Sequence, residues 1–172
     1  MNTIKITSGK FRGRVLSTPG GKTHPMGERE RLALFNMITD VVPEAVVLDA
    51  YAGSGALGIE ALSRGAKSAT FVESSSSAVR TINDNLKRLG INGDAIIAKI
   101  PNYEPGELFD LVLADPPYDR FNLADIEQLE KYVKKGGVLV LSHPGEAPEI
   151  KGLELQKSHK YAGATISVYV KE

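Results

Sequence analysis

An acidic residue followed by two prolines and a tyrosine, Asp115-Pro116-Pro117-Tyr118, comes directly after an apolar run in this chain of 172 residues. Two consecutive prolines fix the backbone and lack N–H donors, so the Asp115 carboxylate and the Pro116 carbonyl would be two rigidly spaced acceptors. Two acceptors suit an NH₂ group, whose lone pair they would turn toward an electrophile. The Tyr118 ring offers a flat face for a base taken out of its stack. This corner therefore indicates chemistry on a planar amine.

A second group of residues has the spacing of a nucleoside-binding loop. Gly53, Gly55 and Gly58 satisfy G-x-G-x-x-G, and Glu73 lies 20 residues after Gly53. Such glycines allow a tight turn, and an acidic residue that ends the next strand can accept the ribose hydroxyls. Asp49 stands four residues before Gly53, where a carboxylate would repel a pyrophosphate but attract an ammonium group. S-adenosylmethionine has an ammonium group, a sulfonium and a ribose but no phosphate, so we expect it rather than NAD.

Strands that alternate with helices must position these residues. Short apolar runs predict strands at 46–49, 69–73, 95–99, 109–115 and 138–142. Helices are expected at 56–64, 76–89 and 122–134, the last ending at Gly136-Gly137, and a terminal hairpin at 153–157 and 165–170. The alternation is typical of a doubly wound α/β domain whose ligand cleft lies at the carboxyl ends of parallel strands. Both groups of residues follow such strand ends, so we expect them to face one cleft.

The first 40 residues differ from the rest of the chain. They predict a hairpin from 3–7 and 14–17, and then a helix over 28–39. Residues 1–31 hold seven basic and two acidic residues, although the 21 basic and 21 acidic residues of the whole chain cancel. We therefore expect a basic extension, residues 1–40, ahead of a catalytic domain, residues 41–172, with a polyanion such as nucleic acid as the partner. Phe11 is expected to pin the hairpin to the body rather than to stack on RNA.

Composition argues against several other kinds of site. The chain has no cysteine and only three widely spaced histidines, which disfavours a thiolate metal site, a cysteine nucleophile and a multi-histidine metal site. Its apolar runs are shorter than the roughly 18 residues of a membrane span. The first residues lack the apolar stretch of a signal peptide. We expect no metal, no membrane association and a cytoplasmic location.

The two motifs resemble those of known enzymes. Residues 48–55 resemble motif I of class I methyltransferases, and residues 115–118 resemble the (Asn/Asp)-Pro-Pro-(Tyr/Phe) motif of amino-methyltransferases. Nearly the whole chain is similar to the bacterial small-subunit ribosomal RNA guanine-N2 methyltransferase family (RsmD type). The residues that carry this resemblance are 8–14, 31–36, 52–66, 71–73, 85–86, 109–110 and 115–118. The stretch 53–66 discriminates best, because Ser63-Arg64-Gly65-Ala66 is not needed for cofactor binding in general.

The resemblance implies a Rossmann-like class I methyltransferase fold with a mostly parallel sheet. It also implies S-adenosylmethionine-dependent methylation of the N2 amine of a guanine in 16S rRNA, within the small ribosomal subunit or an assembly intermediate, by a monomer. Asp49 would hold the methionine amino group, and Glu73 would hold the ribose. The implied catalytic residues are Asp115, Pro116, Pro117 and Tyr118. The implied cofactor-binding residues are Asp49, Ala50, Tyr51, Ala52, Gly53, Ser54, Gly55, Glu73 and Ser74. The implied RNA-binding residues are Lys10, Arg12, Arg14, Arg29, Arg31 and His24, the last at a position where the family usually has arginine.

Three alternatives stay open at this point. A methyltransferase acting on adenine N6 of DNA would carry a target-recognition insert, and no segment is long enough for one. A non-catalytic RNA-binding module would have lost the Asp-Pro-Pro-Tyr corner, which is intact. An NAD-dependent oxidoreductase matches the glycine pattern, but Asp49 and the lack of a well-placed Lys/Tyr or His catalytic group argue against it.

Overall fold

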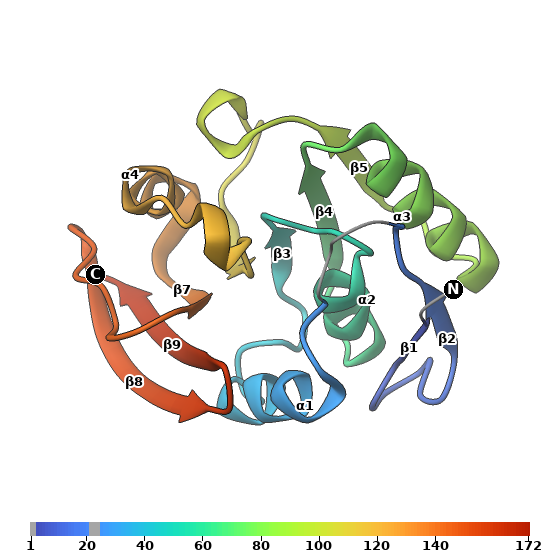
Figure 1. Cartoon of the computed structure of the whole chain (residues 1–172), viewed down its shortest axis with the longest axis horizontal. Coiled ribbons are helices and arrows are strands. Elements are labelled where there is room, and N and C mark those ends of the chain that lie inside the picture. The colour runs from blue at the N-terminus through green and yellow to red at the C-terminus, as the bar shows by residue number, and fades with distance from the viewer. Residues whose placement is uncertain (1–2, 21–24) are drawn as a thin grey trace.

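Seven strands form one mixed sheet in the computed structural model, which describes residues 3–20 and 25–172. Their order is β5-β4-β3-β6-β7-β9-β8. The first five are parallel: β5 (Asp94–Ile97), β4 (Ser68–Glu73), β3 (Val46–Asp49), β6 (Phe109–Ala114) and β7 (Val133–His143). The hairpin of β8 (Leu153–Tyr161) and β9 (Ala164–Lys171) adds to β7 in the antiparallel direction. The expected α/β fold with a terminal hairpin is confirmed (Figure 1).

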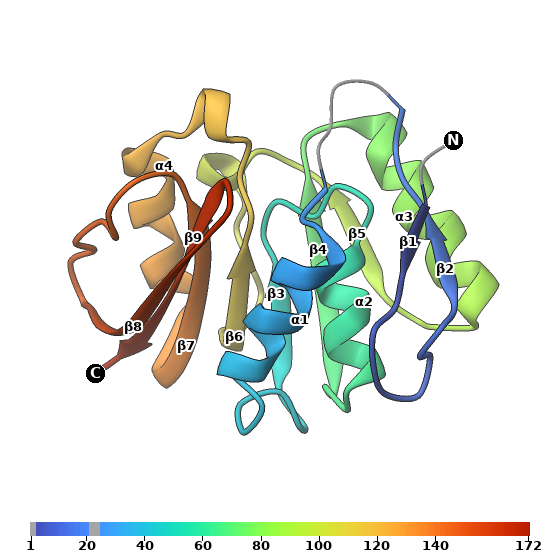
Figure 2. The same ribbon diagram turned by 60° about the horizontal axis from the view of Figure 1, so that its bottom comes forward.

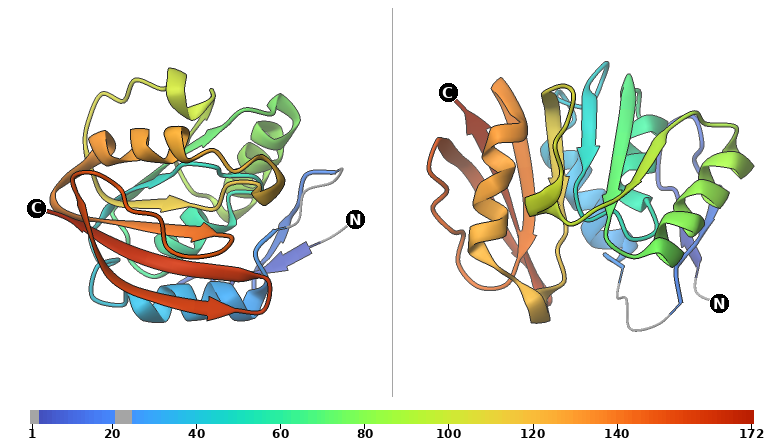
Figure 3. Two further views of the ribbon diagram at one scale, coloured as in Figure 1. Left: turned by 60° about the vertical axis from the view of Figure 1, so that its left-hand side comes forward. Right: turned by 90° about the horizontal axis from the view of Figure 1, so that it is seen from above.

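Helices cover both faces of this sheet. Apolar side chains of α1 (Glu28–Met37), α2 (Ala56–Ser63) and α3 (Ser76–Leu89) fill the core on one face. On the other face the core includes residues of α4 (Leu123–Glu127) and of the 3₁₀ turns η1 (Ile100–Asn102) and η3 (Gln128–Tyr132). Figure 3 shows α1 and α4 on opposite sides of the sheet. No helix within residues 3–20 and 25–172 is long and apolar enough to cross a membrane.

The predicted element boundaries hold best where turn residues flank an element. The strand at 46–49 and the helix at 76–89 have the expected bounds. The expected helix over 122–134 is wrong in its second half, because a 3₁₀ turn ends it at Tyr132 and β7 begins at Val133. Val133 pairs with Phe109 of β6, and an irregularity in the register follows before Val138. The lysine–glycine segment that we expected to end the helix therefore lies in this irregularity within β7.

The basic extension shares the core of the catalytic body. Its strands β1 (Thr3–Lys5) and β2 (Val15–Ser17) form an antiparallel pair that lies beside α2 and α3 (Figure 2). Ile4 and Leu16 are buried in the same core cluster as the side chains of α1, α2 and α3. Phe11 is half-buried against that cluster, so the expectation that it pins the hairpin is confirmed.

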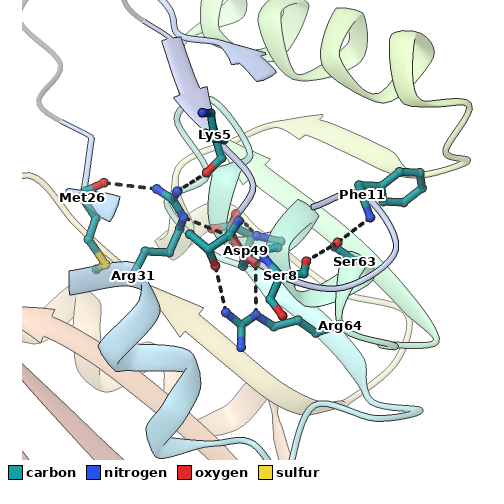
Figure 4. A network of polar contacts seen from close by, with 11 residues as sticks. Lys5, Ser8, Phe11, Met26, Arg31, Asp49, Ser63 and Arg64 are labelled. Atoms are coloured by element: carbon teal, nitrogen blue, oxygen red, sulfur yellow. Dashed lines mark hydrogen bonds and ion pairs between the residues drawn. The ribbon is translucent and has the colours of Figure 1, made fainter. Parts of the chain in front are cut away.

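The fully buried carboxylate of Glu60 attaches this extension to α2. Figure 4 labels three of its partners, Ser8, Arg31 and Arg64. Glu60 accepts hydrogen bonds from the backbone N–H groups of Thr7 (2.9 Å) and Ser8 (3.2 Å). It also forms ion pairs with the Nε atoms of Arg31 (3.3 Å) and Arg64 (3.0 Å). A buried carboxylate needs such partners, because an unpaired charge in the interior is strongly disfavoured.

The last turn of α2 adds a second attachment. The Ser63 hydroxyl donates to the carbonyl of Ser8 (2.6 Å) and accepts from the N–H of Phe11 (2.9 Å), while the Ser63 carbonyl accepts from the N–H of Lys10 (2.8 Å). Gly9 crosses this turn at φ +86°, and a Cβ there would lie 1.9 Å from the Ser63 carbonyl oxygen. The Ser-Arg pair after the glycine loop therefore serves the extension rather than the cofactor.

Replacing Glu60 by glutamine should unfold this junction. Two largely buried arginines would lose their shared counter-charge, and breaking a buried pair typically costs about 3–5 kcal/mol. The matched control is Glu130→Gln, because the Glu130–Lys171 pair (3.1 Å) is partly exposed and should be worth under about 1 kcal/mol. Urea-induced unfolding of both variants measures the difference, and equal losses would contradict the anchoring role of Glu60.

Candidate active site

The loop between β3 and α2 needs its three glycines for different reasons. Gly53 and Gly55 have φ values of +56° and +84°, in the left-handed region that side chains rarely adopt. Gly58 has ordinary helical geometry, but a Cβ there would lie 2.4 Å from Cε1 of Phe71 in β4. The first two glycines shape the turn, and the third lets α2 pack closely on the sheet.

Asp49 ends β3, and its two carboxylate oxygens differ in their hydrogen bonding. Its Oδ2 accepts from the N–H of Gly58 (2.9 Å) in the first turns of α2. Its Oδ1 is buried and has no hydrogen-bond partner within the described part of the chain. Burial, together with the nearby charges of Asp115 and Glu73, raises the pKa of Asp49 from 3.8 to about 8 despite the Gly58 hydrogen bond. A buried acceptor without a partner is a place for a donor from a ligand.

Glu73 lies at the end of the neighbouring strand and holds the glycine loop. One of its oxygens accepts from the N–H of Gly53 (3.3 Å) and the other from the N–H of Ser75 (2.6 Å). The side chain is half-buried, and each carboxylate oxygen can accept a further hydrogen bond. The geometry leaves Glu73 available for two ribose hydroxyls.

The Asp-Pro-Pro-Tyr corner follows β6, which lies next to β3 in the sheet. Burial raises the pKa of Asp115 to about 6, and a hydrogen bond from Ser142 at the end of β7 opposes that rise. The same Ser142 hydroxyl bonds the hydroxyl of Tyr118. Pro116 is buried and Pro117 is exposed. The polar side chains of the corner thus lie at the carboxyl ends of two neighbouring strands, β6 and β7.

One cleft brings Asp49 and Asp115 together, as the strand ends predict. Its walls come from the glycine loop, the start of α2, the two strand ends, Arg31 of α1 and the chain that leaves the basic hairpin. The lining residues are Thr18, Pro19, Pro25, Met26, Arg31, Asp49, Tyr51, Ala52, Gly53, Ser54, Ala56, Leu57 and Asp115. The acidic groups make this cleft suitable for a ligand that carries positive charge.

Four predicted cofactor residues lie outside this lining: Ala50, Gly55, Glu73 and Ser74. Ala50 packs in the core and donates its N–H to the carbonyl of Leu113 (2.9 Å). The predicted contact of its side chain with the cofactor is therefore wrong. Gly55 caps the start of α2 in a left-handed conformation and packs near Phe71. Ser74 is exposed in the turn after β4.

The predicted RNA-binding residues fall into three groups. Lys10, Arg12, Arg14 and Arg29 are exposed, whereas His24 lies outside the described residues. Arg31 is only 2% exposed, and its guanidinium bonds Glu60 and the carbonyl of Lys5 (Figure 4). The expected contact of Arg31 with RNA is therefore wrong, because its charge is used inside the fold.

Comparisons with known proteins agree with this architecture. Residues 4–170 match the family described as Conserved hypothetical protein 95. Ribosomal RNA small subunit methyltransferase D of Haemophilus influenzae is 37% identical over 134 residues, which are 71% of this chain and 67% of that protein. The protein of that name from Buchnera aphidicola (Acyrthosiphon pisum) is 30% identical over 80% of this chain and 76% of its own. A solved structure, a hypothetical protein of Thermus thermophilus, has a TM-score of 0.83 at 31% identity and covers 96% of this chain and 98% of that one.

The chain belongs to the RsmD-type family of class I S-adenosylmethionine-dependent methyltransferases. In this RsmD-type protein, the sequence motifs did not reveal four cleft residues that come from the basic extension: Thr18, Pro19, Pro25 and Met26. Nor did they reveal Ser142 or Glu60. A signal for Glu60 was present, since it is an acidic residue between Ile59 and Ala61 in an apolar helix.

The extension of this RsmD-type protein is also tied to the glycine loop. The fully buried Asn85 of α3 donates through Nδ2 to the carbonyls of Ser17 (2.9 Å) and Ser54 (3.0 Å). Its Oδ1 accepts from the N–H of Ser17 (2.9 Å). One amide side chain thus joins the end of β2 to the loop that lines the cleft.

Asp49→Asn should stabilise the protein without ligand at neutral and higher pH. The folded state holds the Asp49 proton up to about pH 8, whereas the unfolded chain releases it near 3.8. The free energy of unfolding therefore falls as pH rises between those values. The neutral amide of the variant carries no such penalty, so the variant should match the wild type near pH 4 and exceed it at about pH 8 by more than about 1.4 kcal/mol, the equivalent of one pKa unit.

Chemical denaturation across this pH range provides the measurement, with Asp84→Asn on the exposed face of α3 as the control. If the difference in free energy of unfolding between Asp49→Asn and the wild type stays constant with pH, the burial of an ionisable Asp49 is contradicted. The same variant should lose affinity for S-adenosylhomocysteine in calorimetry, because its amide cannot pair with an ammonium group.

Proposed function

We propose that this protein transfers a methyl group from S-adenosylmethionine to the N2 amine of a guanine in 16S rRNA. The substrate is the small ribosomal subunit or an assembly intermediate, and the enzyme acts as a monomer in the cytoplasm. Membership of the RsmD-type family and the 37% identity to a small subunit rRNA methyltransferase support this assignment. Nucleoside mass spectrometry of 16S rRNA from cells with and without the gene tests it, and an unchanged N2-methylguanosine content would refute it.

The observation that carries the proposal is the buried, unpartnered Oδ1 of Asp49 in the same cleft as Asp115. An ammonium group supplies a hydrogen bond and a charge, both of which a buried carboxylate requires. The phosphates of NAD would instead meet the carboxylates of Asp49 and Asp115 in this cleft. The residues present therefore fit S-adenosylmethionine, which supplies an electrophilic methyl group on a sulfonium when bound.

The corner orients the amine. The Asp115 carboxylate and the Pro116 carbonyl accept the two N–H bonds of the guanine N2 group, which turns the nitrogen lone pair toward the methionine end of the cleft. An exocyclic amine is a poor nucleophile, because its lone pair is delocalised into the ring. Positioning of this kind can lower the barrier by several kcal/mol, and the flat Tyr118 ring supports the flipped base.

The Asp115 carboxylate of the corner also accepts the proton that leaves the amine. Once nitrogen has gained the methyl group it is positively charged and releases a proton easily, so a strong base is not required. Asp115 has a pKa of about 6 and already bonds the amine, so its carboxylate can take this proton and pass it to water near neutral pH.

The basic hairpin supplies the contact with RNA. Lys10, Arg12 and Arg14 are exposed, and Arg14 lies against the end of α3, where its Nη2 donates to the carbonyl of Arg88 (3.2 Å). These cations would meet phosphates and set the position of the RNA, while the cleft selects one base. The chain that leaves this hairpin lines the cofactor cleft through Thr18 and Pro19, so the RNA-contacting and cofactor-binding parts adjoin.

Asp115→Ala should lower methyl transfer by at least about 100-fold, because the amine loses one of its two acceptors. Affinity for S-adenosylhomocysteine should persist in this variant. Asp115→Asn keeps an oxygen acceptor and should retain measurable transfer. Single-turnover transfer of labelled methyl to small-subunit particles measures these rates, with Asp119→Ala, an exposed neighbour in η2 (Tyr118–Arg120), as the control. Wild-type transfer by Asp115→Ala would mean that the corner is only a turn.

Replacing Lys10, Arg12 and Arg14 together by alanine should weaken RNA binding and leave cofactor affinity unchanged. Each lost phosphate contact releases about one counterion fewer, so the dependence of affinity on salt should flatten by up to about one unit of slope per residue. The charge-matched control replaces Lys151, Lys157 and Lys160, which lie in or just before β8 at the opposite edge of the sheet (Figure 1). Equal slopes for the two triple variants would assign the hairpin cations to solvent only.

A further inference from the structure

We infer that Ser142 is a positioning residue of the amine-binding corner, which fixes the Asp115 carboxylate and the Tyr118 ring relative to each other. This inference rests on the proposed function of that corner. It goes beyond the motif itself, because Ser142 comes from a different strand, β7, and lies at its carboxyl end. Neither the sequence motifs nor the family membership assigns it a role.

The contacts of Ser142 leave little freedom. Its side chain is only 1% exposed. Its hydroxyl hydrogen-bonds the hydroxyl of Tyr118, and toward the Asp115 carboxylate it acts as a hydrogen-bond donor that lowers the pKa of that group. β7 runs parallel to and paired with β6, which leads into the corner, so the serine is held by the sheet rather than by a loop.

The direction of these hydrogen bonds follows from the donors available. An ionised Asp115 can only accept, so the single proton of the Ser142 hydroxyl points to it, and the Tyr118 hydroxyl donates to the serine oxygen. The sequence of donors is therefore Tyr118 to Ser142 to Asp115. This arrangement engages part of the acceptor capacity of Asp115 and leaves the remainder for an amine N–H.

Two consequences for the reaction follow. The Tyr118 ring is tethered at its hydroxyl end, which sets the plane on which a base can stack. The Asp115 carboxylate receives a hydrogen bond that favours its ionised form, against the effect of burial. The motif assigns a role to the flat Tyr118 ring, and this contact gives the Tyr118 hydroxyl a function as well.

The other charged groups near Asp115 do not replace this hydrogen bond. Asp49, at the end of β3, interacts unfavourably with the Asp115 charge. Tyr118 in η2 is neutral, and burial raises the pKa of its phenol further. Arg31 of α1 lines the same cleft, but it is paired with Glu60. Among these groups only Ser142 donates a hydrogen bond to Asp115.

The test is a double-mutant cycle of Ser142→Ala and Tyr118→Phe, read by single-turnover methyl transfer to small-subunit particles across pH. Ser142→Ala should slow transfer about tenfold at neutral pH, as expected for one lost hydrogen bond. Its acid limb should move to higher pH, because the Asp115 carboxylate loses a stabilising donor. The double variant should be no slower than Ser142→Ala, since the Tyr118 hydroxyl acts through the serine.

The matched control is Ser167→Ala. Ser167 is fully buried on the adjacent strand β9, and its hydroxyl bonds His143 (2.7 Å) and Ser158 (2.9 Å) instead of the corner. Ser167→Ala should leave the acid limb of the pH–rate profile in place. An unmoved acid limb in Ser142→Ala, or additive effects in the cycle, would overturn the inference. Loss of transfer in the wild type itself would instead count against the proposed function, so the two failures are distinguishable.

Discussion

The buried carboxylate of Glu60 is the interaction on which the placement of the site depends. It is shared by Arg31 of α1 and Arg64 at the end of α2 and also accepts two backbone N–H groups from the basic extension. Three segments that are distant in the sequence are therefore fixed to one side chain. α2 begins at the glycine loop and carries Glu60 further along, so whatever Glu60 holds is also held relative to the cofactor cleft. This is why the chain that leaves the hairpin lines that cleft at Thr18 and Pro19.

The two acidic residues of the cleft, Asp49 and Asp115, are buried in a different way from Glu60. Glu60 has a partner for each oxygen, whereas Asp49 keeps one buried oxygen without a partner and Asp115 is held at a raised pKa. Leaving such groups underbonded costs stability in the absence of ligand. The cost is concentrated where a positively charged ligand and an amine can relieve it, which is typical of functional sites. The same helix contacts both carboxylates, since α2 contains Glu60 and its Gly58 donates a hydrogen bond to Asp49 at the end of β3.

Much of the fold could be predicted from the sequence, because strand and helix patterns and glycine turns are local. The strand at 46–49, the helix at 76–89 and the two acids at one cleft were predicted in this way. Arg31 could not be placed, because its charge looks the same in sequence whether it meets RNA phosphate or a buried carboxylate 29 residues away. The helix over 122–134 failed for a related reason, since its end is decided by pairing of Val133 with Phe109 in another strand.

Ser142 marks the limit of motif-based analysis most clearly. Asp49 ends β3, Asp115 follows β6 and Ser142 lies near the end of β7, and these three strands are neighbours in the sheet. A sequence motif records the first two because each lies in a recognisable turn. The third is an ordinary serine after an apolar strand, and only the strand order gives it a place. In a parallel sheet, a polar residue near the carboxyl end of the strand beside a motif is therefore a natural candidate for a positioning role. Here its buried hydroxyl meets both polar side chains of the corner, so the sheet itself completes the site that the Asp-Pro-Pro-Tyr turn begins.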